Sequence, residues 1–86
     1  MKELERVLKA LANKRRLAII KYLKQEKEAT VGDISEEIKL SFKATSKHLG
    51  VLAAVDIVEK EQRGLRMWYR LSPALHPIVK QISNSF

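Results

Sequence analysis

Residues 41–71, SFKATSKHLGVLAAVDIVEKEQRGLRMWYRL, contain the pattern that decides the fold. The first half, up to about Val55, predicts a helix that Ser41 can cap. The second half has two β-prone runs, 57–62 and 66–71, separated by Arg63-Gly64-Leu65. Such a spacing predicts a β-hairpin with a positive-φ glycine at its tip. The stretch therefore predicts a helix that runs directly into a hairpin.

The charges of the predicted helix are all of one sign. Between Ser41 and Val55 the only charged side chains are Lys43 and Lys47, four residues apart and so on one face. A solvated helix usually mixes signs, so this face favours an anionic partner such as a phosphate backbone. The alternative is a surface helix that simply lacks acids.

The composition supports the same class of partner. The 86-residue chain has 17 Lys and Arg against 10 Asp and Glu, a net charge of +7, and its length predicts one domain, 1–86. It has no cysteine, which excludes disulfides and thiolate metal sites and fits a cytoplasmic protein. We see no secretory signal and no membrane-spanning run, so no membrane association is expected.

Capping residues and apolar spacing define the other elements. Asn13 is a suitable N-cap for a second helix, and Thr30 with Asp33 resembles a capping box for a short third one. Residues 29–31 are also compatible with a short strand. The sequence predicts a mainly α fold with a small β-hairpin, a winged helix-turn-helix of about five helices plus a two-stranded wing. The helices are expected over 2–12, 14–25, a segment after Thr30, 41–55 and 77–83.

The hairpin is predicted to have two unlike faces. Alternation along its second strand puts Met67, Tyr69 and Leu71 toward the core and Arg66, Trp68 and Arg70 on a basic outer face. Arg63 and Arg66 flank the tip, where guanidinium groups can grip phosphates or enter a minor groove. The alternative is a pair of solvated charges beside Glu59 and Glu61.

An ordered set of motifs resembles the ArsR-type (arsenical-resistance repressor) winged-helix transcription factors. The matching residues are Ser46-Lys47-His48-Leu49, Ile57-Val58, Gly64 and Tyr69-Arg70-Leu71, preceded by LKALANKRRLAIIKYL. The resemblance implies a homodimeric repressor whose two recognition helices read half-sites about one helical turn apart. It also implies that the first and last helices form the dimer interface, for which the candidates are Leu4, Leu8, Leu75, Ile78, Ile82 and Phe86.

Three departures from the family pattern matter. Thr30 and Gly32 occupy the positions where metal-sensing members carry a Cys-Val-Cys pair, and residues 72–86 offer only His76 as a ligand. A zinc site needs three or four ligands, so we expect no metal and no cofactor. Asp56 stands where the family usually has glycine, at the point where the chain is expected to leave the recognition helix through a left-handed residue. Gly50 lies inside the recognition helix and should weaken it by roughly 1 kcal/mol against alanine.

The predicted DNA-binding residues lie on this helix and on the wing. Thr45 lies nearer the core side, so packing or capping suits it better than base contact. His48 lies between the core and outer faces, and we favour packing or backbone bonding over direct DNA contact. The predicted set is Ser41, Lys43, Ala44, Ser46, Lys47, His48, Arg63, Gly64 and Arg66.

Two other functions compete with a regulator that binds double-stranded DNA. The first is a winged-helix module that binds another protein, and the second is a non-specific nucleic-acid-binding protein. An enzyme is not expected, because no nucleophile, base and orienting group occur together. The sequence identifies no operator and no effector.

Overall fold

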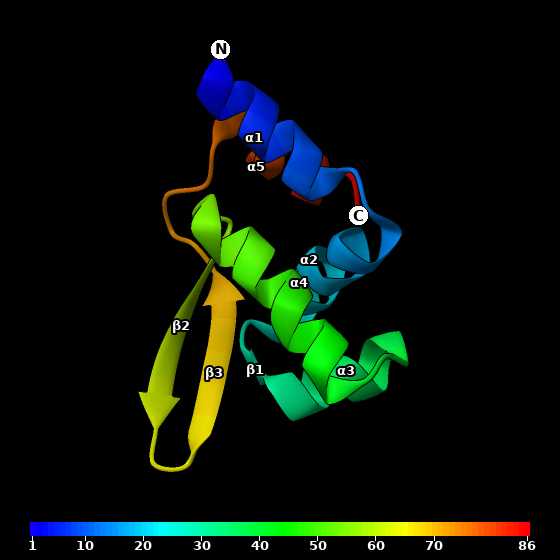
Figure 1. The fold of residues 1–86 in the computed structure, drawn as a ribbon. Helices are drawn as coiled ribbons and strands as arrows, with labels where there is room; N and C mark the ends of the chain where they lie inside the picture. The colour runs from blue at the N-terminus through cyan, green and yellow to red at the C-terminus, as the bar shows by residue number, and fades with distance from the viewer.

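The computed structural model describes residues 1–86, in five helices and three short strands (Figure 1). The predicted third helix begins directly after β1, and the predicted hairpin follows the fourth helix after a turn over residues 55–57. The elements are α1 Lys2–Leu11, α2 Lys14–Glu26, β1 Ala29–Thr30, α3 Val31–Ile38, α4 Phe42–Ala54, β2 Val58–Arg63, β3 Arg66–Leu71 and α5 Pro77–Ser83.

Side-chain caps fix where three of the helices begin. Asn13 Oδ1 accepts hydrogen bonds from the backbone N–H groups of Arg15 and Arg16 at 2.9 and 3.1 Å. Thr30 and Asp33 form the reciprocal capping box, with bonds of 3.1 and 3.3 Å. All three predicted caps, including Ser41, are confirmed because each satisfies N–H groups that the first helical turn leaves unpaired.

The sheet has three strands, so the prediction of a two-stranded wing was incomplete. The strand order is β1-β3-β2, and both pairings are antiparallel. Ala29 pairs with Tyr69 and Thr30 with Trp68. A strand of two residues is too short to show alternation, and its pairing depends on a partner almost forty residues away. This short strand connects the middle of β3 to the start of α3.

One core joins all the helices to the inner face of the sheet. Ile19, Ile20, Leu49 and Leu52 have no exposed surface, and each such burial contributes about 1.5–3 kcal/mol. Tyr69 is buried on the sheet's inner face, as predicted. The helical segments therefore hold α4 and the wing in fixed positions.

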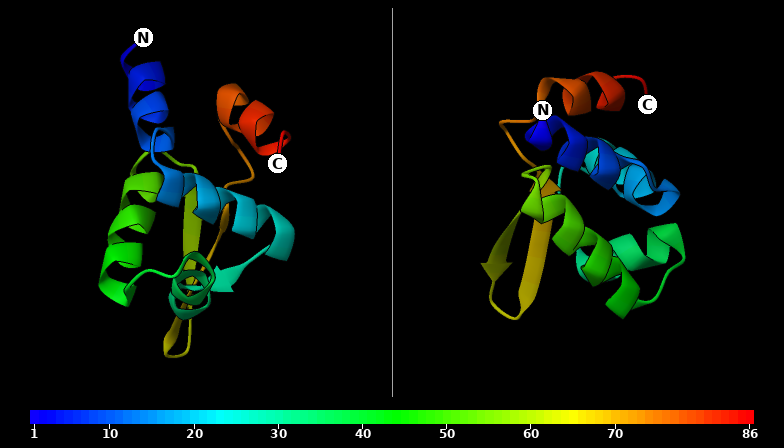
Figure 2. Two further views of the ribbon diagram at one scale, coloured as in Figure 1. Left: turned by 90° about the vertical axis from the view of Figure 1, so that its right-hand side faces the viewer. Right: turned by 45° about the horizontal axis from the view of Figure 1, so that its top comes forward.

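The last helix, α5, packs closely against the core and α2. Its Val79 has no exposed surface, and Lys24 Nζ of α2 donates a hydrogen bond to the carbonyl of Ser83. Both terminal helices lie at the end of the molecule away from the hairpin tip (Figures 1 and 2). None of the five helices combines the length and the apolar character that spanning a membrane requires.

Candidate nucleic-acid interface

A three-residue turn sets α4 at an angle to α3. Lys39 adopts a left-handed conformation with φ of 55°, and the next N–H, of Leu40, donates to the carbonyl of Ser35 at 3.0 Å. Ser41 Oγ then accepts from the N–H of Ala44 at 3.1 Å and starts α4. A bond back to the last turn followed by a new N-cap produces the sharp change of direction that a helix-turn-helix requires.

The faces of α4 separate as predicted. Thr45 and Leu49 have no exposed surface, whereas Lys43, Lys47 and Gly50 are exposed. A Cβ at Gly50 would meet no atom within 4 Å, so the outer face is open there. No acid interrupts this face, which leaves both ammonium groups free for an anion. Ala44, Ser46 and His48 are half-buried along its edges, and Ser41 is exposed at its start.

The wing projects from the body as a hairpin with a two-residue loop. Gly64, with φ of 61°, and Leu65 connect β2 to β3, and Arg63 pairs with Arg66 at the tip. Asp56 has φ of 58°, as predicted for the residue by which the chain leaves α4. An aspartate tolerates this region at some cost because its side chain can bond locally. Gly64 and Asp56 both adopt positive φ at points where the chain changes direction.

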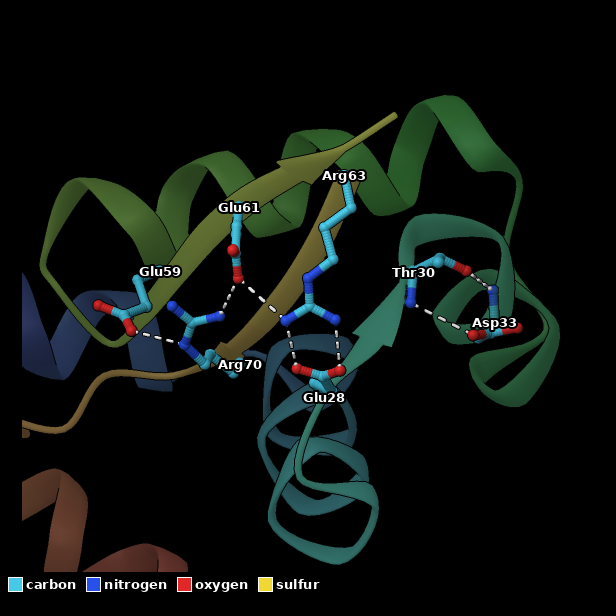
Figure 3. A network of polar contacts seen from close by, with 7 residues as sticks. All are labelled: Glu28, Thr30, Asp33, Glu59, Glu61, Arg63 and Arg70. Carbon is cyan, nitrogen blue, oxygen red and sulfur yellow. Dashed lines mark hydrogen bonds and ion pairs between the residues drawn. The ribbon is translucent and has the colours of Figure 1, made fainter. Parts of the chain in front are cut away.

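The outer face of the hairpin is not basic, and that prediction was wrong (Figure 3). Arg70 Nε donates to Glu59 at 2.7 Å, and its Nη1 donates to Glu61 at 2.9 Å. The residues that pair across the strands on this face include Glu59 opposite Arg70 and Glu61 opposite Trp68. Alternation along one strand cannot show which charges the other strand places opposite. On this face the charge of Arg70 is therefore paired with the carboxylates of the neighbouring strand.

Arg63 takes part in this network, whereas Arg66 does not. The two terminal nitrogens of Arg63 donate to the two carboxylate oxygens of Glu28 at 2.7 and 2.9 Å. Nη2 of Arg63 also donates to Glu61 at 2.9 Å. The guanidinium carbon lies 5.1 Å from the centroid of the Trp68 ring, a cation–π distance. Arg66 is exposed and forms no ion pair. Of the two arginines at the tip, Arg66 is free.

The arginines hold the neighbouring carboxylates in their ionised form. Hydrogen bonding to Arg63 lowers the pKa of Glu28 and, together with Arg70, that of Glu61. The same bonds raise the pKa of Arg63, which is always protonated in any case. Near neutral pH the network is therefore fully charged.

The six predicted dimer residues are not equally exposed. Leu8 and Phe86 each retain 45% of their surface, and Leu4 is half-buried. Leu4 and Leu8 line a shallow, mostly apolar groove along α1 that includes Met1 and Ala12. Leu75, Ile78 and Ile82 are half-buried and pack against the core. Among the six candidates, the most exposed are therefore Leu8 on α1 and Phe86 at the C-terminus.

The positions that would carry a metal site have other roles. Thr30 caps α3 with its side chain, and Gly32 offers only its backbone, whose carbonyl accepts from Ser35 Oγ at 2.9 Å. His76 Nδ1 accepts a bond from the N–H of Ile78 at the start of α5. No cluster of three or more His, Cys, Asp or Glu side chains with the spacing of a metal site is present.

The family model for bacterial regulatory proteins of the arsR family matches residues 13–60, from the cap of α2 into β2. The chain belongs to the ArsR family. This ArsR protein is 38% identical over 66 residues to the transcriptional activator HlyU of Vibrio cholerae. The match spans 77% of the present chain and 60% of HlyU.

Solved structures share the ArsR protein's fold over almost its whole length. The structure of V. cholerae HlyU has a TM-score of 0.83 at 32% identity and covers 98% of this chain and 87% of HlyU. The homodimeric winged helix-turn-helix DNA-binding domain Mb0332 from Mycobacterium bovis has a TM-score of 0.84 at 31% identity, covering 98% and 75%. The transcriptional repressor BigR from Xylella fastidiosa has a TM-score of 0.79 at 31% identity, covering 98% and 79%. The named relatives are regulators rather than enzymes.

Sequence reasoning missed two residues of this ArsR protein that touch the interface. Glu28 precedes β1 and holds Arg63 of the wing, 35 residues away. Arg16 of α2 contacts His48 of α4, 32 residues away. Neither residue stands out in its own segment.

Proposed function

We propose that this ArsR-family protein is a homodimeric transcriptional regulator that binds double-stranded DNA at specific sequences. One observation carries the proposal. The second helix of the helix-turn-helix presents Lys43 and Lys47 on an exposed face that contains no acid. A helix of this width fits the major groove, where lysine can reach phosphates or the O6 and N7 acceptors of guanine. Membership of a family of regulators supports the same function.

The proposed interface extends from α4 to the wing. Ser41, Ala44 and Ser46 border the two lysines, and small side chains there allow a phosphate backbone to approach. Arg66 and the backbone of Gly64 are the accessible groups of the wing tip. Arg63 remains a candidate contact, but a phosphate would have to replace its carboxylate partners.

We propose that α1 and α5 form the contact with a second copy. The exposed Leu8 and the groove that it shares with Leu4 form an apolar surface that a partner helix can cover. The Mb0332 domain is described as homodimeric, which supports the same assembly here. Leu8→Lys should shift the sedimentation coefficient from dimer to monomer, whereas Leu65→Lys, at the fully exposed wing tip, should leave it unchanged.

The relatives regulate transcription in both directions. HlyU is described as an activator and BigR as a repressor, so regulators of both signs occur among the relatives. We propose repression, by occupation of an operator, in the cytoplasm. A reporter gene placed behind the bound sequence should be silenced when the protein is expressed, and increased reporter output would overturn this part.

Selection from a random duplex library at physiological salt tests the central proposal. Enrichment of an inverted repeat is expected, because two copies related by a two-fold axis present two α4 helices. Retention of duplex with no enriched sequence, reversed by modest salt, would indicate a non-specific nucleic-acid-binding protein. Failure to retain any duplex would favour a protein-interaction module.

A further inference from the structure

The side chain of Arg16 joins the end of α1 to the flank of α4. Its Nε donates to the carbonyl of Ala10 at 2.6 Å, and its Nη2 donates to the carbonyl of Lys9 at 3.2 Å. These carbonyls belong to the last turn of α1, where no intrahelical donor remains. The third nitrogen, Nη1, lies 3.2 Å from Nδ1 of His48. One guanidinium therefore connects two elements that only tertiary packing brings together.

The contact with Arg16 determines where the imidazole of His48 carries its proton. A guanidinium has only N–H donors, so Nδ1 of His48 has to accept. A neutral ring that accepts at Nδ1 carries its hydrogen on Nε2. Burial lowers the pKa of His48, and so do the charges of Arg16 and Arg15 from α2 and of Lys47 on α4 itself. The ring is therefore neutral near pH 7.

The donor on Nε2 has no partner within the chain. The hydrogen bond to Arg16 is the only side-chain bond of His48. A buried side-chain nitrogen or oxygen without a partner occurs only at Thr45 Oγ1. Nε2 of His48 also has no partner, so it is not buried and solvent reaches it. It lies on the residue next to Lys47, at the edge of the acid-free face of α4. The Nε2–H therefore has no partner in the chain and belongs to a residue at the edge of the proposed interface.

We propose that Arg16 fixes His48 as the neutral Nε2–H tautomer and that this N–H donates a hydrogen bond to DNA. The DNA contact rests on the proposed function, whereas the tautomer does not. Arg16 is a positioning residue here, because it acts on DNA only through His48. A neutral donor positions the helix without releasing counterions, so its loss should leave the salt dependence of binding unchanged. In this respect it differs from Lys47.

Nuclear magnetic resonance of the free protein tests the tautomer. Long-range nitrogen–proton correlation of the imidazole at neutral pH should show a protonated Nε2 and an unprotonated Nδ1 in His48. Arg16→Met should populate the second tautomer and raise the pKa of His48. His76 is an internal reference, because its Nδ1 accepts from a backbone N–H that Arg16 does not touch. A wild-type spectrum with the proton on Nδ1 of His48 would overturn the proposal without any variant.

A pair of near-isosteric variants tests the contact with DNA. The amide nitrogen of His48→Gln can occupy the place of Nε2, whereas that of His48→Asn lies near the place of Nδ1. His48→Gln should bind the selected duplex about as well as wild type. His48→Asn should bind about three- to tenfold more weakly, the usual effect of one lost hydrogen bond, with the same salt slope. Circular dichroism would confirm that both variants fold.

The outcomes separate the contact from the proposed function. Equal affinity of His48→Asn and wild type would refute the contact while DNA binding stood. A wild-type protein that retained no duplex would remove the proposed function and the contact together. The tautomer, measured in the free protein, would be decided in either case by its own spectrum.

Discussion

Replacing Glu28 with Gln should tighten DNA binding, because it removes the carboxylate that holds Arg63 of the wing. Both oxygens of Glu28 accept from Arg63, at 2.7 and 2.9 Å, in a two-pronged ion pair (Figure 3). A phosphate can bind this guanidinium only by displacing a carboxylate. Glutamine keeps the size of the side chain but has no charge and only one acceptor oxygen. The substitution thus lowers the free-energy cost of replacing this partner of Arg63 by a phosphate, and it changes the shape of the side chain little.

The expected gain is small, and the structure shows why. The side chains of Arg63 and Glu28 are 41% and 35% exposed, so water screens the pair. Exposed ion pairs change an equilibrium constant by roughly a factor of one to five. Glu61 still accepts from Arg63 at 2.9 Å in the variant, so Glu28→Gln should improve the dissociation constant about twofold. Adding Glu61→Gln should bring the gain to about fivefold.

Fluorescence anisotropy with the selected duplex at fixed salt measures this gain. Glu59→Gln is the matched control, because it removes the same charge from the same face but pairs only with Arg70. Equal gains for Glu28→Gln and Glu59→Gln would mean that only the overall charge matters. The double variant with Arg63→Gln completes the test. If Glu28→Gln has its full effect in that background, the reasoning about a released arginine is refuted.

Four further predictions concern the helix, its core and its effectors. Lys47→Ala should weaken binding to every duplex by a similar factor and reduce the salt slope by about one, and an unchanged affinity would remove Lys47 from the interface. Thr45→Val should raise the free energy of unfolding by about 1 kcal/mol in a denaturant titration, because Thr45 Oγ1 is buried without a partner. The same substitution should leave DNA affinity unchanged. A destabilised variant would show that the hydroxyl is bonded. The lowered pKa of His48 means that the unfolded chain takes up this proton first, so stability should fall as the pH drops through the ordinary value of 6.5 and level off below the native pKa. His48→Gln should flatten that part of the curve, and an identical slope would contradict the assignment. Stoichiometric zinc, arsenite or cadmium should not release DNA, and release would show that ligand positions were overlooked.

Local chemistry made much of the fold predictable from the sequence. Asn13, Thr30 with Asp33, and Ser41 mark helix starts because a side chain caps N–H groups two or three residues away. Gly64 and Asp56 mark reversals because glycine adopts positive φ freely and aspartate tolerates it at some cost, whereas no residue type in the sequence signals the positive φ of Lys27 and Lys39. Helical periodicity separated Lys43 and Lys47 from the buried face. The ordered motifs of the family added the expectation of a dimer, whose interface the proposed variants will test.

The pairing of distant side chains was decided only by the tertiary structure. Periodicity shows which face of a helix or strand a residue occupies, but it does not show which residue from another segment lies opposite. For this reason β1 was left out of the predicted wing, and the outer face of the hairpin was taken as basic when Arg63 and Arg70 are paired there. The contact of Arg16 with His48 has the same origin. The sequence determined which groups α4 and the wing present, and the packing of α1, α2 and β1 decided which of them remain free.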